Sequence, residues 1–189
     1  ALPIYYAEAI VNFEKYLKQN PKDEDFKHDA MLRLADSYFV TGKYWPAMEA
    51  YDKVITANVS NTDYAAFQKA ISYGIVDRVP KKIEALNAFI THYPKSNLRE
   101  DAIYELANTY VGQGKMEKAS ELYEMLQSQY QEGTYTARAM LREGLMLYNK
   151  NENQKALAIF KKITQKYPSS PEAMQAVSSA KNIYAEMGK

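Results

Sequence analysis

The stretch LADSYFVTGKYWPA (residues 34–47) decides the fold of this 189-residue chain, because it returns as LANTYVGQGKMEKA (residues 106–119). Both copies place a small residue after Leu, a Tyr three positions later, a Gly-Lys pair, and an Ala twelve positions after the small residue. Weaker copies contain Ala70 and Gly144, so the small residues lie at positions 35, 70, 107 and 144. Steps of about this length are typical of solenoids, in which each repeat packs only on its neighbours.

Each copy has the apolar spacing of two helices. Met31, Leu34, Ala35 and Tyr38 recur at three and four residues, as the apolar residues of one helix face do. Gly ends the first helix in a left-handed turn, and Pro pushes the residue before it out of helical geometry at the end of the second. We predict ten antiparallel helices, with turns near Gly42, Pro80, Gly114 and Glu152 and corners near Pro21, Asn61, Pro94, Gly133 and Ser169.

The pattern resembles the tetratricopeptide repeat (TPR). The residues that match the TPR motif are Met31, Leu34, Ala35, Tyr38, Ala47 and Tyr51; Ala70, Tyr73, Leu86 and Pro94; Ile103, Leu106, Ala107, Tyr110, Ala119 and Tyr123; and Met140, Gly144, Ala156, Phe160 and Pro168. The resemblance covers nearly the whole chain and implies an all-α, right-handed α-solenoid. The second copy departs most from the motif, since Lys82 replaces the small residue and Asp77 the glycine, and we expect its helix pair to be the least regular.

The phase of the repeat predicts four complete units and two broken ones within a single solenoid. The complete units span 26–59, 62–94, 99–131 and 136–168. Residues 1–21 read as a second helix without its first, and residues 172–189 as a first helix without its second. We therefore expect the sequence to be a window of a longer array, in which the broken ends offer a route to homo-oligomers.

Composition excludes several kinds of chemistry. The chain contains no Cys, which excludes disulfides, Cys-ligated zinc, iron–sulfur clusters and thiol catalysis. A net charge of +1 argues against a nucleic-acid partner, and no apolar run is long enough to predict a membrane span. The sequence carries no phosphate-loop, dinucleotide-binding, serine-hydrolase or zinc-protease motif. We predict a non-catalytic protein without cofactor or metal.

Two histidines, His28 and His92, are the remaining candidates for acid–base or metal chemistry. Asp25, His28 and Asp29 form the nearest cluster of metal-ligating types, but acidic residues in a first helical turn are ordinary partners of the helix dipole. We expect both histidines to be solvated residues at helix ends.

Helical phase places another set of residues on the face of the first helices that lines the concave surface of a TPR superhelix. This set predicts a groove for a partner polypeptide, because it combines aromatic and apolar side chains with a few polar ones. Its members are Asp36, Phe39, Tyr64, Phe67, Ile71, Tyr104, Asn108, Leu141, Leu145, Tyr148 and Asn149. The alternative is that superhelical curvature buries this face against the second helices. Tyr38, Tyr73, Tyr110 and Tyr184, by contrast, are predicted to pack between helices.

The resemblance also bears on the kind of partner. TPR domains that clamp a terminal carboxylate carry Lys at a site where this chain has Leu32, Phe67, Tyr104 and Leu141, so an extended or helical apolar ligand is favoured. A second surface is basic: residues 138–189 carry nine basic and four acidic side chains, against 15 and 19 in residues 1–137. Lys150, Lys155, Lys161, Lys162 and Lys166 dominate it. We interpret them as a solvated face, with steering of an acidic partner or of lipid headgroups as the alternative.

The corners Tyr93-Pro94-Lys95-Ser96 and Tyr167-Pro168-Ser169-Ser170 resemble those of TPR proteins of the bacterial cell envelope, of the Tol-Pal coordinator and outer-membrane assembly lipoprotein type. That resemblance implies a periplasmic or outer-membrane-associated scaffold, with the cytoplasm as the alternative. The rival interpretation of function is an accessory or architectural TPR module of a larger multidomain enzyme or sensor.

Overall fold

The computed structural model describes residues 2–188, and within them the chain is helical throughout, with ten helices and no strand. In chain order the helices are α1 (Leu2–Lys18), α2 (Glu24–Val40), α3 (Tyr44–Ala57), α4 (Thr62–Ile75), α5 (Val79–His92), α6 (Arg99–Gly112), α7 (Met116–Gln129), α8 (Thr136–Asn149), α9 (Asn153–Lys166) and α10 (Pro171–Met187). The predicted fold class, an all-α array of helix pairs, is confirmed. Among the described helices, none is both long and apolar enough to cross a membrane.

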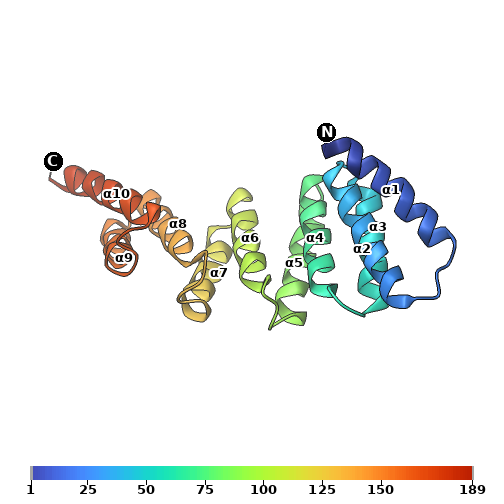
Figure 1. Cartoon of the computed structure of the whole chain (residues 1–189). Coiled ribbons are helices and arrows are strands. Elements are labelled where there is room, and N and C mark those ends of the chain that lie inside the picture. Colours follow the sequence, from blue (N-terminus) through green and yellow to red (C-terminus); the bar gives the residue numbers. More distant parts are fainter. Residues whose placement is uncertain (1, 189) are drawn as a thin grey trace. The chain divides into compact units, whose positions relative to one another are not determined.

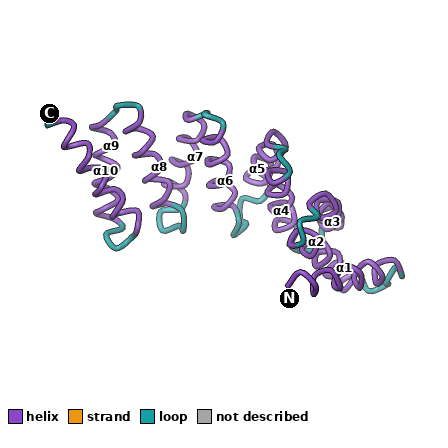
Figure 2. The backbone as a smooth tube through the Cα atoms, turned by 90° about the horizontal axis from the view of Figure 1, so that it is seen from above, coloured by secondary structure: helices purple, strands orange, loops and turns teal. Residues whose placement is uncertain are grey.

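The helices fall into two compact units, which meet at Arg99 and Glu100. Unit 1 holds α1 to α5, drawn from blue to green in Figure 1, and unit 2 holds α6 to α10, drawn from yellow-green to red. Within each unit, short loops join successive helices, as the teal segments of Figure 2 show. That the two units continue one solenoid stays a prediction.

One turn geometry closes all four helix pairs. Its central residue has a left-handed backbone: Gly42 and Gly114 at φ 77° and 71°, Asp77 and Asn151 at φ 57° and 61°. The next backbone N–H donates to the carbonyl oxygen five residues before it, as from Lys43 to Tyr38 at 2.8 Å and from Arg78 to Tyr73 at 2.7 Å. Asp and Asn tolerate the left-handed region better than other residues with a side chain. Asp77 therefore forms the same turn as the glycines of the motif.

The turn predicted near Pro80 is present and spans Val76–Arg78. Pro80 itself lies in the first turn of α5. Proline suits the first helical turn because the backbone N–H it lacks would have no partner there.

Lys82 is accommodated by a glycine on the facing helix. A Cβ placed on Gly74 would come within 2.7 Å of Lys82 Cδ, so the methylene stem of Lys82 lies across the bare backbone of α4. The first helices of the other pairs carry Phe39, Val111 and Tyr148 at the position of Gly74. The missing side chain on α4 thus makes room for the long side chain on α5.

In three of the four pairs the core forms where two small residues meet, the exception being the pair that contains Lys82. Ala35, Ala47, Ala107, Ala119 and Ala156 are all fully buried, which confirms the predicted helix crossings. Each second helix adds one large buried residue four positions after its crossing site: Tyr51, Leu86, Tyr123 and Phe160. Of the tyrosines predicted to pack between helices, Tyr110 is buried, but Tyr184 is 63% exposed, because no described helix follows α10 to cover it.

Candidate partner-binding surface

The predicted groove residues divide between the two units. Asp36 and Phe39 of α2 and Tyr64, Phe67 and Ile71 of α4 form what we call the unit 1 face. Tyr104 and Asn108 of α6 and Leu141, Leu145, Tyr148 and Asn149 of α8 form the unit 2 face. Most of these side chains are half-buried and Asn149 is exposed. Leu141, however, is only 7% exposed and belongs to the core of unit 2, so its prediction as a partner-binding residue is wrong.

A hydrogen-bond network built on one carboxylate oxygen organises the unit 1 face. Asp36 Oδ1 accepts from the hydroxyl of Tyr51 at 2.6 Å and from the hydroxyl of Tyr64 at 3.0 Å. Gln68 Nε2 donates to the Tyr64 hydroxyl at 3.3 Å, and the Tyr51 and Tyr64 rings meet edge to face. The carboxylate thus joins α2 to a buried residue of α3 and a half-buried residue of α4.

The same network sets the protonation of its tyrosines. Burial, the negative charge of Asp36 and the hydrogen bond to Asp36 raise the pKa of Tyr64 to about 12. Burial and the hydrogen bond to Asp36 raise the pKa of Tyr51 still further. Both hydroxyls therefore remain protonated donors at neutral pH, and Asp36 Oδ1 remains their acceptor.

In the unit 2 face an amide takes the place of the carboxylate. Asn108 Oδ1 accepts from the hydroxyl of buried Tyr123 at 2.8 Å, in the same relation as Asp36 to Tyr51. The other two repeats are apolar at both positions, where Ile71 accompanies Leu86 and Leu145 accompanies Phe160. Among the four complete repeats, a polar residue occupies the first-helix position only where the second helix brings a buried tyrosine hydroxyl. A polar atom satisfies that hydroxyl, which would otherwise lose its partner on burial.

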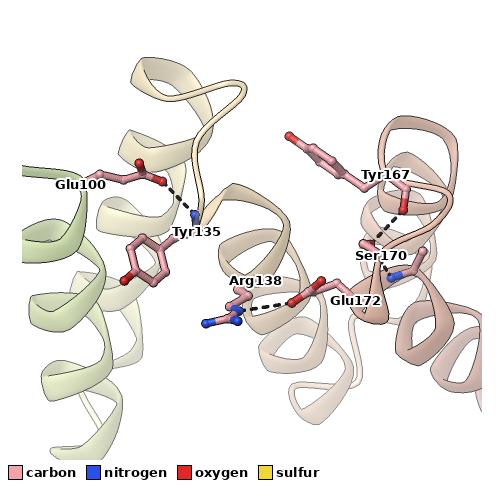
Figure 3. Close-up of polar contacts among 7 residues, drawn as sticks. Glu100, Tyr135, Arg138, Tyr167, Ser170 and Glu172 are labelled. Carbon is pink, nitrogen blue, oxygen red and sulfur yellow. Dashed lines mark hydrogen bonds and ion pairs between the residues drawn. The ribbon is translucent and has the colours of Figure 1, made fainter. Parts of the chain in front are cut away.

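Sequence reasoning missed Tyr135, which lies at the corner before α8. Its ring stacks on Tyr104 with the centroids 4.5 Å apart, and its hydroxyl donates to Asp101 Oδ1 at 2.9 Å. Figure 3 shows its backbone N–H pointing at Glu100 Oε1, a distance of 2.8 Å. Tyr135 is the last residue of the corner between α7 and α8, outside any helical apolar pattern, so helical spacing did not reveal it.

Charged side chains join the starts of the first helices in unit 2. Arg138 Nε of α8 lies 3.3 Å from Glu172 Oε1 of α10 (Figure 3). Near the other end of α8, the Tyr148 hydroxyl donates to Glu186 Oε1 at 2.6 Å. The unit 2 face is therefore braced by contacts within the chain at both ends of α8.

His28 corrects a prediction made from the sequence. It lies inside α2 and is 5% exposed, and its Nε2 lies 2.8 Å from the carbonyl oxygen of Ser60. His28 is thus a packed residue that ties α2 to the corner before α4. His92 is exposed near the end of α5, as predicted, with Nδ1 2.7 Å from the Ala88 carbonyl oxygen. Within residues 2–188 no group of three metal-ligating side chains gathers.

The cavities described in the structure lie elsewhere. In unit 1, one of about 410 Å³ lies between α1 and α3 with Met31, Leu34 and Tyr38 of α2 as its floor. A second, of about 480 Å³, repeats this arrangement between α3 and α5, with Ala66, Lys69 and Tyr73 of α4 beneath. Tyr38 and Tyr73 therefore line grooves between second helices as well as packing. Their recurrence in the repeat is the signal that could have indicated this second role.

Much of the predicted basic surface is paired within the chain. Lys150 Nζ lies 3.3 Å from Glu117 Oε1, Lys155 pairs with Glu152, and Lys166 Nζ lies 3.5 Å from Glu132 Oε1. These pairs are largely exposed, and such pairs contribute little to stability. They do reduce the cationic surface that α9 presents, which favours the solvated-face interpretation.

Comparison with known proteins agrees with the repeat and the geometry. Two family models, both described as tetratricopeptide repeat, match residues 29–58 and 104–171. A crystal structure of MamA is 26% identical with a TM-score of 0.65, over 85% of this chain and 88% of that one. YrrB, described as a TPR protein with an unusual peptide-binding site, is 16% identical with a TM-score of 0.63, over 92% and 84%.

A third similar structure is that of the nearly identical TPR-like repeats of a putative kinesin light chain from Podosopora anserina. It is 17% identical with a TM-score of 0.59, over 86% of this chain and 87% of that one. Comparison with curated protein sequences gives no match. The two family models together cover about half of the chain, and the similar structures extend the likeness over most of it; the chain is therefore built of tetratricopeptide repeats.

Proposed function

We propose that this chain is a non-catalytic interaction scaffold that binds a partner polypeptide on the unit 1 and unit 2 faces. The observation that carries the proposal is the recurrence of half-buried aromatic side chains at one phase of the first helices: Phe39, Phe67, Tyr104 and Tyr148. Aromatic side chains bury a large area with few rotatable bonds, which makes them effective anchors for a partner. YrrB, which is described as having a peptide-binding site, supports the same role for the fold.

A location in a bacterial cell envelope is proposed on the Tyr-Pro-x-Ser corners alone. In the structure, the final Ser of each corner caps the following helix or its approach: Ser170 Oγ accepts from Ala173 N at 3.0 Å and Ser96 Oγ from Leu98 N at 3.1 Å.

The test uses a phage-displayed library of random 12-residue peptides, selected on the immobilised chain, with affinities of the enriched peptides measured by fluorescence polarisation. We expect Phe67→Ser and Tyr104→Ser each to weaken binding about tenfold or more, the effect of losing a buried aromatic anchor. The matched controls are Val40→Ser and Ile75→Ser, which remove apolar residues 56% and 48% exposed on α2 and α4 outside the face. They should leave the affinity unchanged.

Thermal melts by circular dichroism accompany each variant. Phe67 contacts buried Phe89 and Tyr104 contacts buried Tyr123, so a modest loss of melting temperature is expected. If selection yields no binding peptide, or if the controls weaken binding as much as the face variants, the proposed function is wrong. A loss of about 3–5 kcal/mol on truncating Phe67 or Tyr104 would instead make these residues core, as the rival interpretation holds.

A further inference from the structure

The unit 1 face carries a negative charge, that of Asp36, at a repeat position where a neutral residue can make the same hydrogen bond. Asp36 and Asn108 stand at the same place in the repeat and accept the hydroxyl hydrogen bond of an equivalent buried tyrosine, at 2.6 Å and 2.8 Å. Satisfying Tyr51 therefore does not require a carboxylate. A half-buried charge carries a desolvation cost that the amide avoids.

Asp36 makes no ion pair with the described residues of the chain. The negative charge of Asp36 acts on the neighbouring Arg33 only at a distance, because the Arg33 guanidinium is held by Asp29, with Nε 2.7 Å from Oδ2. The two tyrosine hydroxyls both bind Oδ1 of Asp36, and no described contact uses Oδ2. One oxygen of the carboxylate is thus fixed in position, while the other keeps its capacity to accept.

Aromatic residues lie next to the carboxylate. Tyr64 of α4 touches it through its hydroxyl, and Phe39, almost one turn after Asp36 on α2, packs on the cluster that contains Tyr51. A cation beside a carboxylate and over aromatic rings gains both a charge-assisted hydrogen bond and cation–π attraction. Carboxylate and rings together have the chemistry of a receptor for a positively charged side chain.

We propose that Asp36, with Tyr64 and Phe39, binds a lysine or arginine side chain of the partner polypeptide. The inference rests on the proposed function, since it names the chemistry recognised on the unit 1 face. Asn108 gives the equivalent place on the unit 2 face no charge. A partner therefore carries a basic residue where it meets α2 and α4 of unit 1.

The experiment uses the peptides enriched on the wild-type chain and compares them on Asp36→Asn. This variant copies the arrangement of Asn108 and keeps an acceptor for Tyr51, so its melting temperature should match the wild type. We expect the enriched peptides to share a Lys or Arg, and Asp36→Asn to weaken them about tenfold or more, the range of a hydrogen bond to a charged group. Replacing that Lys or Arg by Gln should weaken wild-type binding equally and leave binding to Asp36→Asn unchanged.

Asn108→Asp supplies the converse variant, because it places a carboxylate at the equivalent position of unit 2. Selection on this variant should enrich peptides with a Lys or Arg whose binding no longer depends on Asp36. Peptides that depend on Phe67 but lack a shared Lys or Arg, or that bind Asp36→Asn as tightly as wild type, would overturn the cation receptor and leave the proposed function standing. Independence from Phe67 as well would overturn both.

Discussion

Replacing Gly144 by Ala tests the packing of the helix crossings. Gly144 occupies the site where the other three first helices carry Ala, so the repeat pattern alone predicts that alanine would stabilise α8 by about 1 kcal/mol through helix propensity. The structure predicts the opposite sign. A Cβ on Gly144 would lie 2.5 Å from Cε1 and 3.0 Å from Cδ1 of Phe160, a ring that is 1% exposed.

The magnitude follows from two opposing effects. Forcing a methyl group into a packed core costs roughly 1–3 kcal/mol, which offsets the gain in propensity and leaves a net loss of about 1 kcal/mol. For a chain of this length such a loss lowers the melting temperature by about 2–4 °C. Urea unfolding followed by circular dichroism measures the free energy, and a thermal melt gives the second value.

Two further variants make the test specific. Gly74→Ala places its Cβ against the flexible side chain of Lys82, which can move, so this variant should be neutral or stabilising. Phe160→Leu recreates the pairing of Ala70 with Leu86 found between α4 and α5, and in that background Gly144→Ala should become stabilising. If Gly144→Ala stabilises the wild-type chain as Gly74→Ala does, or if Phe160→Leu fails to reverse its sign, the packing argument is refuted.

Two other predictions concern single polar groups. Burial raises the pKa of Glu143 above its ordinary value of 4.5, partly offset by the hydrogen bond from Gln127, so the native state binds more protons than the unfolded state. The free energy of unfolding should accordingly fall as the pH rises from 4.5 through the raised pKa. Glu143→Gln keeps an acceptor for Gln127 and should flatten this fall, as measured by urea titrations at several pH values. A steeper fall in the variant would contradict the raised pKa of Glu143. His28→Leu should lower the free energy of unfolding by about 1–3 kcal/mol, because the Ser60 carbonyl loses its hydrogen-bond partner. His92→Leu, at an exposed residue, should leave the urea midpoint unchanged. Equal effects of the two variants would show that His28 does not tie α2 to Ser60.

The repeat pattern predicted the helices and crossings because both depend on residues close in sequence. Ala35 and Ala107 recur with their whole surroundings, and helical spacing then fixes which side chains face the partner helix. Asp77 replaces the glycine of the motif without changing the turn, because Asp also adopts the left-handed backbone.

The errors at the site have a different origin, since they depend on contacts between distant residues. His28 is buried by Ser60, 32 residues later, and Tyr135 reaches Asp101, 34 residues earlier. Neither partner lies within the helical window that periodicity reads. The pairing of Asp36 with Tyr51 could have been found in the sequence by comparing the same two positions in all four repeats. Where the second position holds Tyr, the first holds Asp or Asn; where the second holds Leu or Phe, the first is apolar.

That relation determines how the partner-binding surface has to be probed. Alanine at Asp36 would leave the buried Tyr51 hydroxyl without its acceptor and cost about 1–3 kcal/mol of stability, so a loss of binding in that variant would confound folding with recognition. Asparagine removes only the charge, as Asn108 demonstrates in its own repeat. The two faces also differ in charge. Asp36 on α2 keeps a negative charge after it has accepted the hydrogen bond of Tyr51, whereas Asn108 on α6 accepts the hydrogen bond of Tyr123 and has no charge. The repeats are therefore equivalent in how they fold and different in what they offer a partner, and Asp36 is the residue at which that difference is measured.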